Sequence, residues 1–244
     1  MSVSSAARTH RGCRRKHNED QVLLRPGLGP DGSWLLLAVA DGMGGAAQGG
    51  RASREAIRVL GLELERWRDG NPGETLQAAF VAANRFLVDL SNSRRSHRGM
   101  GTTLVAALTD GRDAWVGNVG DSRAYRLSAG LMRQLTEDHS LVAEQVKAGY
   151  LDEQAAATSP HRNIITRSLG HSDSLAVDVF GPLQLRPGDL LLLCSDGLYG
   201  VVSESEMAGI ASSFSPDEAA DRLIALANER GSPDNVSVVV ARFE

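Results

Sequence analysis

Acidic residues stand at the ends of five apolar, strand-like runs, and these runs are spread over the whole sequence. The run 34–40, for example, ends directly at Asp41. A carboxylate at the end of a buried strand is costly unless something neutralises its charge. An Asp-Gly turn is the simplest interpretation of one such site, but five indicate one convergent cluster. The residues concerned are Glu19 and Asp20, Asp41, Asp121, Asp196, and Asp234 with its neighbour Asn235.

Clustered carboxylates without nearby cysteines favour hard divalent cations held through oxygen, such as Mg²⁺ or Mn²⁺. Calcium has less support because no EF-hand loop is present, and zinc because the histidines are scattered without ligand spacing. A glycoside hydrolase needs only a pair of acids. Two divalent ions about 3.5–4 Å apart are a recurring means of cleaving phosphate esters, with an arginine to orient the phosphate. Arg14 or Arg15 could supply that guanidinium.

The composition is that of a soluble globular protein, with 42% hydrophobic and 23% charged residues. A formal net charge of −4 gives no electrostatic case for nucleic-acid binding, and the cations of 14–17 are most simply a solvated loop. Cys13 and Cys194 are too few for a disulfide framework. We therefore expect a cytoplasmic location, without a signal peptide and without a membrane-spanning segment.

The apolar patterns predict strands, then two helices, then a run of strands, then helices and a last strand. The predicted strands are 6–13, 20–24, 34–40, 102–108, 113–119, 123–127, 131–135, 175–180, 189–194 and 236–241, and the predicted helices are 46–67, 72–90, 140–148, 203–211 and 216–230. This order lacks the strict alternation of a doubly wound sheet. It predicts an α+β fold: a four-layer αββα sandwich of two packed antiparallel sheets flanked by helices, in a single domain over 1–244. The polar stretch at about 138–170 is predicted to form a flap over a site.

Six motifs follow one another along the chain: Arg15-x-x-Asn18-Glu19-Asp20, Asp41-Gly42-Met43-Gly44-Gly45, Gly99-Met100-Gly101-Thr102-Thr103, Gly120-Asp121-Ser122-Arg123, Ser195-Asp196-Gly197-Leu198 and Asp234-Asn235. In this order they resemble the motifs of the metal-dependent serine/threonine protein phosphatases of type 2C, above all their short stand-alone bacterial members. Each motif alone is weak, but six in the right order over about 8–242 are specific. The segment 162–170 also resembles the one that follows the mobile flap in that family.

The resemblance implies a role for each of these residues. Asp41 would bridge two ions, Mn²⁺ or Mg²⁺, and a water between them would attack phosphorus without a phosphoenzyme intermediate. Arg15 would bind the substrate phosphate, because its spacing before Glu19 matches the family pattern. The other implied positions are Asp196 and Asp234 on one ion, Glu19 and the Gly42 carbonyl on the second, Asp121 with Asp196 on a more weakly held third, and Asp20 and Asn235 supporting the ligands from outside.

Met43 departs from the animal members, which carry a histidine there that is proposed to protonate the leaving oxygen. His139, His161 and a metal-associated water are the alternatives, so the resemblance leaves this proton donor open. The chain is expected to hydrolyse phosphoserine and phosphothreonine in proteins, reversing a bacterial serine/threonine kinase in signal transduction, as a monomer. The alternatives are a catalytically silent module that binds phosphoproteins, a phosphatase for one regulator, and a role in type VI secretion control.

Overall fold

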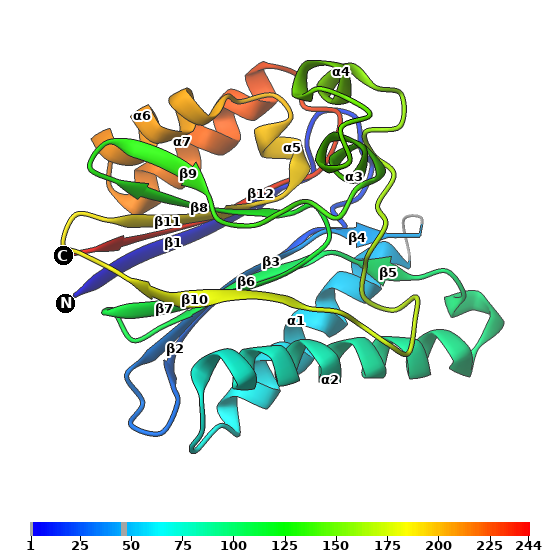
Figure 1. The fold of residues 1–244 in the computed structure, drawn as a ribbon, viewed down its shortest axis with the longest axis horizontal. Coiled ribbons are helices and arrows are strands. Elements are labelled where there is room, and N and C mark those ends of the chain that lie inside the picture. The colour runs from blue at the N-terminus through cyan, green and yellow to red at the C-terminus, as the bar shows by residue number, and fades with distance from the viewer. Residues whose placement is uncertain (1, 45–47) are drawn as a thin grey trace.

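Two antiparallel sheets pack face to face, and helices cover their outer faces (Figure 1). The computed structural model describes residues 2–44 and 48–244. Within these residues each of the two sheets has five strands, and a two-stranded ribbon lies at one end of the sandwich. This layered α+β arrangement confirms the predicted fold class.

The first sheet pairs the two ends of the described chain. Strands β1 and β12 run antiparallel from Val3 opposite Phe243 to His10 opposite Val236. The strand order of this sheet is β1 (Val3–His10), β12 (Val236–Phe243), β11 (Leu190–Cys194), β8 (Arg123–Ser128) and β9 (Leu131–Gln134). The order of the second sheet is β10 (Asp178–Gln184), β7 (Asp113–Val119), β6 (Leu104–Thr109), β3 (Trp34–Ala40) and β2 (Gln21–Leu28). The short ribbon pairs β4 (Gly42–Met43) with β5 (Gly101–Thr102).

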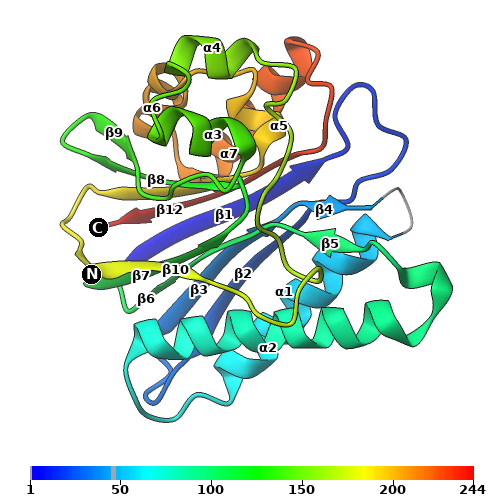
Figure 2. The same ribbon diagram turned by 45° about the vertical axis from the view of Figure 1, so that its right-hand side comes forward.

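Helices α1 (Gly49–Glu65) and α2 (Pro72–Ser93) cover the second sheet, and a 3-10 turn (Arg95–His97) follows them (Figure 2). The Asn71 side chain caps α2 by accepting hydrogen bonds from the first N–H groups of that helix. The first sheet is covered by α5 (Asp196–Tyr199), α6 (Glu204–Ser213) and α7 (Pro216–Glu229). Reciprocal capping boxes begin α6 and α7, formed by Ser203 with Glu206 and by Ser215 with Glu218.

The strand β3 illustrates why a continuous apolar run is buried on both faces. Leu37 and Val39 belong to the core between the two sheets. Leu36 and Ala38 alternate with them and pack with Leu60 of α1 in the core beneath the helices. Because both faces of the strand are covered, no polar alternation appears in its sequence.

Helices α3 (Leu141–Lys147) and α4 (Glu153–Thr158) follow β9 and precede β10 in the sequence. They lie at the end of the sandwich that also holds the short ribbon (Figure 1). The first was predicted, but the second falls in a stretch predicted to be loop. No residue of α4 is buried, so its sequence carries no apolar stripe. Only the cap at Asp152, which accepts from the Ala155 N–H, marks its start.

Several strand boundaries differ from prediction, for example that of β2, which ends at residue 28 rather than 24, and two of the differences have a backbone reason. The first strand covers 3–10 rather than 6–13, because Gly12 turns the chain with φ 71° and a Cβ there would lie 1.9 Å from the Asp234 carbonyl oxygen. Strand β10 covers 178–184 rather than the predicted 175–180, and it continues through Pro182. It is the edge strand of its sheet, where a proline is tolerated because one side of the strand has no hydrogen-bonding neighbour. Residues 46 and 47 of the predicted helix 46–67 lie outside the described residues. No helix in the described ranges is long and apolar enough to cross a membrane.

Candidate metal centre

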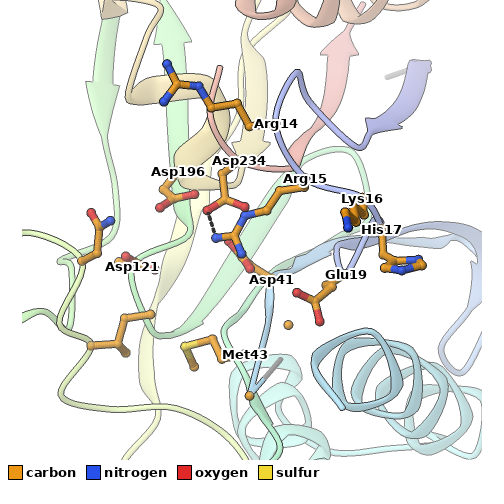
Figure 3. A pocket seen from close by; sticks show the side chains of 14 residues that line it. Arg14, Arg15, Lys16, His17, Glu19, Asp41, Met43, Asp121, Asp196 and Asp234 are labelled. Carbon is orange, nitrogen blue, oxygen red and sulfur yellow. Dashed lines mark hydrogen bonds and ion pairs between the residues drawn. The ribbon is translucent and has the colours of Figure 1, made fainter. Parts of the chain in front are cut away.

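A pocket of about 530 Å³ opens at the end of the sandwich where β3 and β11 end (Figure 3). Five of the predicted acids and the predicted glycine line it, namely Glu19, Asp41, Gly42, Asp121, Asp196 and Asp234. The rest of the lining consists of Arg14, Arg15, Lys16, His17, Met43, Gly44, Asn163 and Ile165. The structure therefore brings together acids that the sequence places more than a hundred positions apart.

Antiparallel pairing explains this convergence. Strand β3 ends beside the start of β2, which brings Asp41 to Glu19. Strand β11 ends beside the start of β12, which brings Asp196 to Asp234. Asp121 follows the end of β7, a third strand that stops at the same end of the sandwich.

Asp41 is fixed through its backbone by two buried threonines. Its N–H donates to Thr103 Oγ1 at 3.0 Å, and its carbonyl accepts from Thr102 Oγ1 at 2.8 Å. Thr103 Oγ1 also lies 2.8 Å from the hydroxyl of Ser122, the neighbour of Asp121. One buried hydroxyl therefore connects the segments that carry two acids of the pocket. The sequence contains this Gly-Thr-Thr motif, but only the structure gives its contacts.

Asp20 is completely buried and does not line the pocket. Its Oδ2 accepts hydrogen bonds from Ser195 Oγ at 2.8 Å and from Ser237 Oγ at 2.6 Å. Burial raises the pKa of this carboxyl to about 7 in spite of those two bonds. Because Ser195 directly precedes Asp196, the buried carboxyl holds the start of α5 from behind the pocket.

Asn235 holds the loop that carries Arg15. Its Oδ1 accepts from the Glu19 N–H at 2.8 Å, and its Nδ2 donates to the carbonyls of Arg11 and His17, both at 2.9 Å. A single buried amide therefore fixes both ends of the loop 11–17 and the backbone of one predicted ligand. Like Asp20, it lies outside the residues that line the pocket.

The acids of the pocket raise one another's pKa values. Burial, followed by the charges of Asp20 and Asp196, raises the pKa of Asp41 well above its ordinary value. Burial and Asp196 raise the pKa of Asp121 to about 8, and burial and Asp234 raise that of Asp196 to about 6. The nearby arginines do not offset this mutual repulsion, and a divalent cation bound among the carboxylates would lower their pKa values.

Two buried oxygens of the pocket accept no hydrogen bond from any described residue, Glu19 Oε1 and Asp196 Oδ1. Unsatisfied carboxylate oxygens are the donors that Mg²⁺ and Mn²⁺ prefer. Among the described residues, however, no three His, Cys, Asp or Glu side chains lie close enough together in their present conformations to hold an ion. The types and burial of the donors fit a hard divalent cation, and binding one would require these side chains to move closer together.

Arg15 reaches into the carboxylate cluster. Its Nη2 donates to Asp234 Oδ2 at 2.6 Å (Figure 3). This bond raises the pKa of the guanidinium further above its ordinary value. The sequence predicted a phosphate-binding role for Arg15 but gave no indication of this ion pair. The side chain remains 51% exposed, so a ligand in the pocket can reach it.

Neither histidine considered as a proton donor is among the residues that line the pocket. His139 is buried, and its Nε2 lies 3.1 Å from Asp178 Oδ2 in a contact away from the acids. His161 is exposed. Two residues that sequence reasoning missed, Asn163 and Ile165, do line the pocket from the predicted flap, and neither their types nor their spacing distinguishes them.

The fold and the carboxylate pocket are those of a phosphatase family. A family model described as "Protein phosphatase 2C" matches residues 11–234. The chain belongs to this family and is an enzyme of the serine/threonine protein phosphatase class, as its motifs predict.

Individual members of the family are similar to this chain over nearly its full length. The serine/threonine phosphatase stp of Listeria innocua is 40% identical over 248 residues, covering 96% of this chain and 93% of the relative. The crystal structure of the Mycobacterium tuberculosis serine/threonine phosphatase PstP/Ppp has a TM-score of 0.89 and 37% identity, covering 100% of both chains. A PstP catalytic domain in complex with two manganese ions has a TM-score of 0.85 and 36% identity, covering 98% of this chain and 97% of the other.

Proposed function

We propose that the protein hydrolyses phosphoserine and phosphothreonine in proteins and that this activity depends on Mn²⁺ or Mg²⁺. One observation carries the proposal: five acids from strands of both sheets line one pocket, with unsatisfied buried oxygens, beside a reachable arginine. An apolar or purely structural pocket would not leave carboxylate oxygens without partners. The manganese complex of a relative at 36% identity supports the same choice of ion.

The residues that would hold the ions follow from their places in the pocket. Asp41 follows β3 and would serve two ions, with Asp196 and Asp234 at strand ends of the first sheet on one ion and Glu19 with the Gly42 carbonyl, near strand ends of the second sheet, on the other. Asp121, beside Asp196, would complete a third and weaker position. Bound there, divalent ions would activate a water and stabilise the charged oxygens of a phosphate ester.

Arg15 would orient the phosphate. A cation on Asp234 competes with the ion pair that Arg15 now makes, so loading the site would free the guanidinium for a bidentate contact with phosphate oxygens. Met43 lines the pocket at the position of the animal histidine and carries no transferable proton. A water in the pocket would then supply the proton for the leaving oxygen.

The biological setting follows from this activity. Its substrates would be phosphorylated proteins, and its counterpart a serine/threonine kinase acting on the same residues in a bacterial cytoplasm. We propose that the enzyme works as a monomer in a single catalytic domain, with the flap at about 138–170 beside the pocket. The alternative is a catalytically silent relative that binds phosphoproteins through the same arginine and pocket.

The deciding experiment measures hydrolysis of an aryl phosphate and a phosphothreonine peptide with Mn²⁺, with Mg²⁺ and with EDTA. The wild type should turn over both substrates with either metal and neither substrate in EDTA. Asp196→Ala should abolish turnover, while Asp69→Ala, which removes an exposed acid outside the pocket, should leave it unchanged. A folded wild type that stays inactive with every metal but retains a phosphopeptide would support the silent alternative.

A further inference from the structure

One wall of the pocket is a run of cationic and titratable side chains, Arg14 to His17. Arg15 is paired with Asp234. Arg14 and Lys16 are exposed, and within the described residues neither side chain makes a hydrogen bond or an ion pair. In Figure 3, Arg14 lies to one side of Arg15 and Lys16 to the other, and neither enters the carboxylate cluster. The wall therefore presents two free positive charges that flank the predicted phosphate-binding residue.

The loop that carries these charges is held in place rather than loosely attached. Besides the two bonds from Asn235 to its ends, the Cys13 N–H donates to the Ser232 carbonyl at 3.0 Å. Gly12 packs so closely against the Asp234 carbonyl that no side chain would fit there. The loop is thus attached to the chain segment that also supplies a predicted metal ligand, so the backbone from which its cations extend is held beside the pocket.

The positive charges of Arg14 and Lys16 are not neutralised by ion pairs with the carboxylates of the pocket. The chain as a whole has a net charge of −4, so a cationic wall is a local feature. If divalent ions neutralise the acids of the pocket, the unpaired charges of Arg14 and Lys16 remain exposed on its wall. A group that neutralises them has to come with the substrate.

We propose that Arg14 and Lys16 form a second anion-binding site, which selects phosphoprotein segments with a further negative group close to the phosphate being removed. This inference rests on the proposed function and names the substrate class for the same pocket. The shared chemistry is an anionic oxygen cluster, either the carboxylate of a neighbouring Asp or Glu or a second phosphate.

Cations on both sides of Arg15 suit an extended peptide, whose side chains follow one another at short intervals. An extended chain advances roughly 3.3 Å per residue, so a group one or two residues from the phosphorylated position lies roughly 3–7 Å along the segment. With Arg15 on the central phosphate, the long side chains of its two sequence neighbours, which line the same pocket, would contact such groups. The Arg14 guanidinium can make a bidentate contact with a carboxylate or phosphate, whereas Lys16 contributes a point charge.

The test compares four phosphothreonine peptides that differ only in their flanks: alanine, aspartate, lysine, or a second phosphothreonine two residues away. The readout is kcat/KM relative to the alanine peptide, at low and at high salt. For the wild type we expect the aspartate or doubly phosphorylated peptide to exceed the alanine peptide by about 5-fold to 10-fold, the lysine peptide to fall below it, and salt to reduce both differences. In the double variant Arg14→Gln/Lys16→Gln the ratio should fall to about one.

Arg133→Gln is the matched control, because it removes an exposed arginine of β9 that does not line the pocket, and it should keep the wild-type ratio. A preference for aspartate alone assigns a carboxylate to the site, and a preference for the second phosphate alone assigns a phosphate. A wild-type ratio near one for both peptides, or a preference that survives in the double variant, overturns the inference. Failure to hydrolyse even the aryl phosphate with Mn²⁺ would instead overturn the proposed function, and this inference with it.

Discussion

The hydroxyl of Thr103 lies between the backbone of Asp41 and the side chain of Ser122, and it is completely buried. Thr103→Val keeps the shape of the side chain but leaves two polar groups without a partner. We expect it to lower the free energy of unfolding by about 1–3 kcal/mol. Because the Asp41 backbone loses a contact that fixes it, the Mn²⁺ concentration for half-maximal activity should rise about tenfold.

Thr109→Val provides the control for that effect. Thr109 is equally buried, and its hydroxyl donates to the Asp113 carbonyl at 2.7 Å, at the far end of strand β6, which Thr103 directly precedes. Urea unfolding should show a similar loss of stability for both variants, whereas a metal titration of activity should shift for Thr103→Val only. An equal shift in both would mean that Thr103 acts through general stability alone.

Asp189 makes a pH-dependent contribution to stability far from the pocket. Its carboxylate accepts from Arg126 Nη2 at 2.5 Å and from the Arg186 N–H at 2.9 Å. Burial alone would raise its pKa, but these bonds together with one from Ser128 hold the pKa below the ordinary value. The unfolded chain therefore binds the proton more tightly, so this stability is present above about pH 3.9 and is lost as the pH falls through the lower folded value.

Asp189→Asn should accordingly cost about 1–3 kcal/mol at neutral pH, because Arg126 loses its partner. The difference from wild type should shrink below about pH 4, where the unfolded wild-type chain begins to bind a proton that the folded carboxylate still excludes. Urea unfolding in EDTA at several pH values measures both quantities, with the exposed Asp69→Asn as the control. A difference that stays constant down to about pH 3 would contradict the assignment.

At the scale of elements, the turn after β1 is set by one close backbone approach. Gly12 and Gly130 both have positive φ, 71° and 79°, but only Gly12 has a carbonyl oxygen in the place of a Cβ, whereas Gly130 has nothing within 4 Å. Gly130→Ala should cost about 1–2 kcal/mol from the backbone alone. Gly12→Ala should cost more and should also weaken Mn²⁺ binding, since it displaces the segment of Asp234.

Thermal unfolding and a metal titration of the two alanine variants separate these effects. The Gly130→Ala protein should keep the wild-type metal requirement while it loses stability. If Gly12→Ala also kept that requirement, the close contact would have no bearing on the pocket.

The sequence predicted most elements because their signals are local. Apolar runs, alternation and caps such as Asn71 lie within a few residues of the element that they define. The convergence of Asp41 with Asp196 was also predictable, because an acid recurs at the ends of five apolar runs and each such charge is costly alone. The contact between Arg15 and Asp234 was not, since it depends on how a side chain turns between segments that are distant in sequence. Helix α4 was missed because it buries nothing.

At the scale of the whole molecule, ion binding should stabilise the fold, because the acids that would hold the ions come from both sheets. Mn²⁺ at about a hundred times its dissociation constant should add about 2.7 kcal/mol. For a domain of this size that corresponds to a rise in Tm of about 5–10 °C, reversed by EDTA. Asp196→Asn should reduce the rise measured by scanning calorimetry, and an unchanged rise would mean that the ion binds elsewhere.

The pairing of β1 with β12 has one more consequence. Residues 2 and 244 exchange backbone hydrogen bonds of 2.9 Å in both directions, at the end of the sandwich opposite the pocket (Figure 1). A linker of about three residues would therefore close the polypeptide into a ring. A circular permutant opened at the exposed hairpin of Ala129 and Gly130 would keep every strand neighbour and leave the pocket untouched. The permutant would form the same two sheets with a different order of strands in the sequence. Assembly of the sheets would then depend on the contacts between the strands and not on their order along the chain.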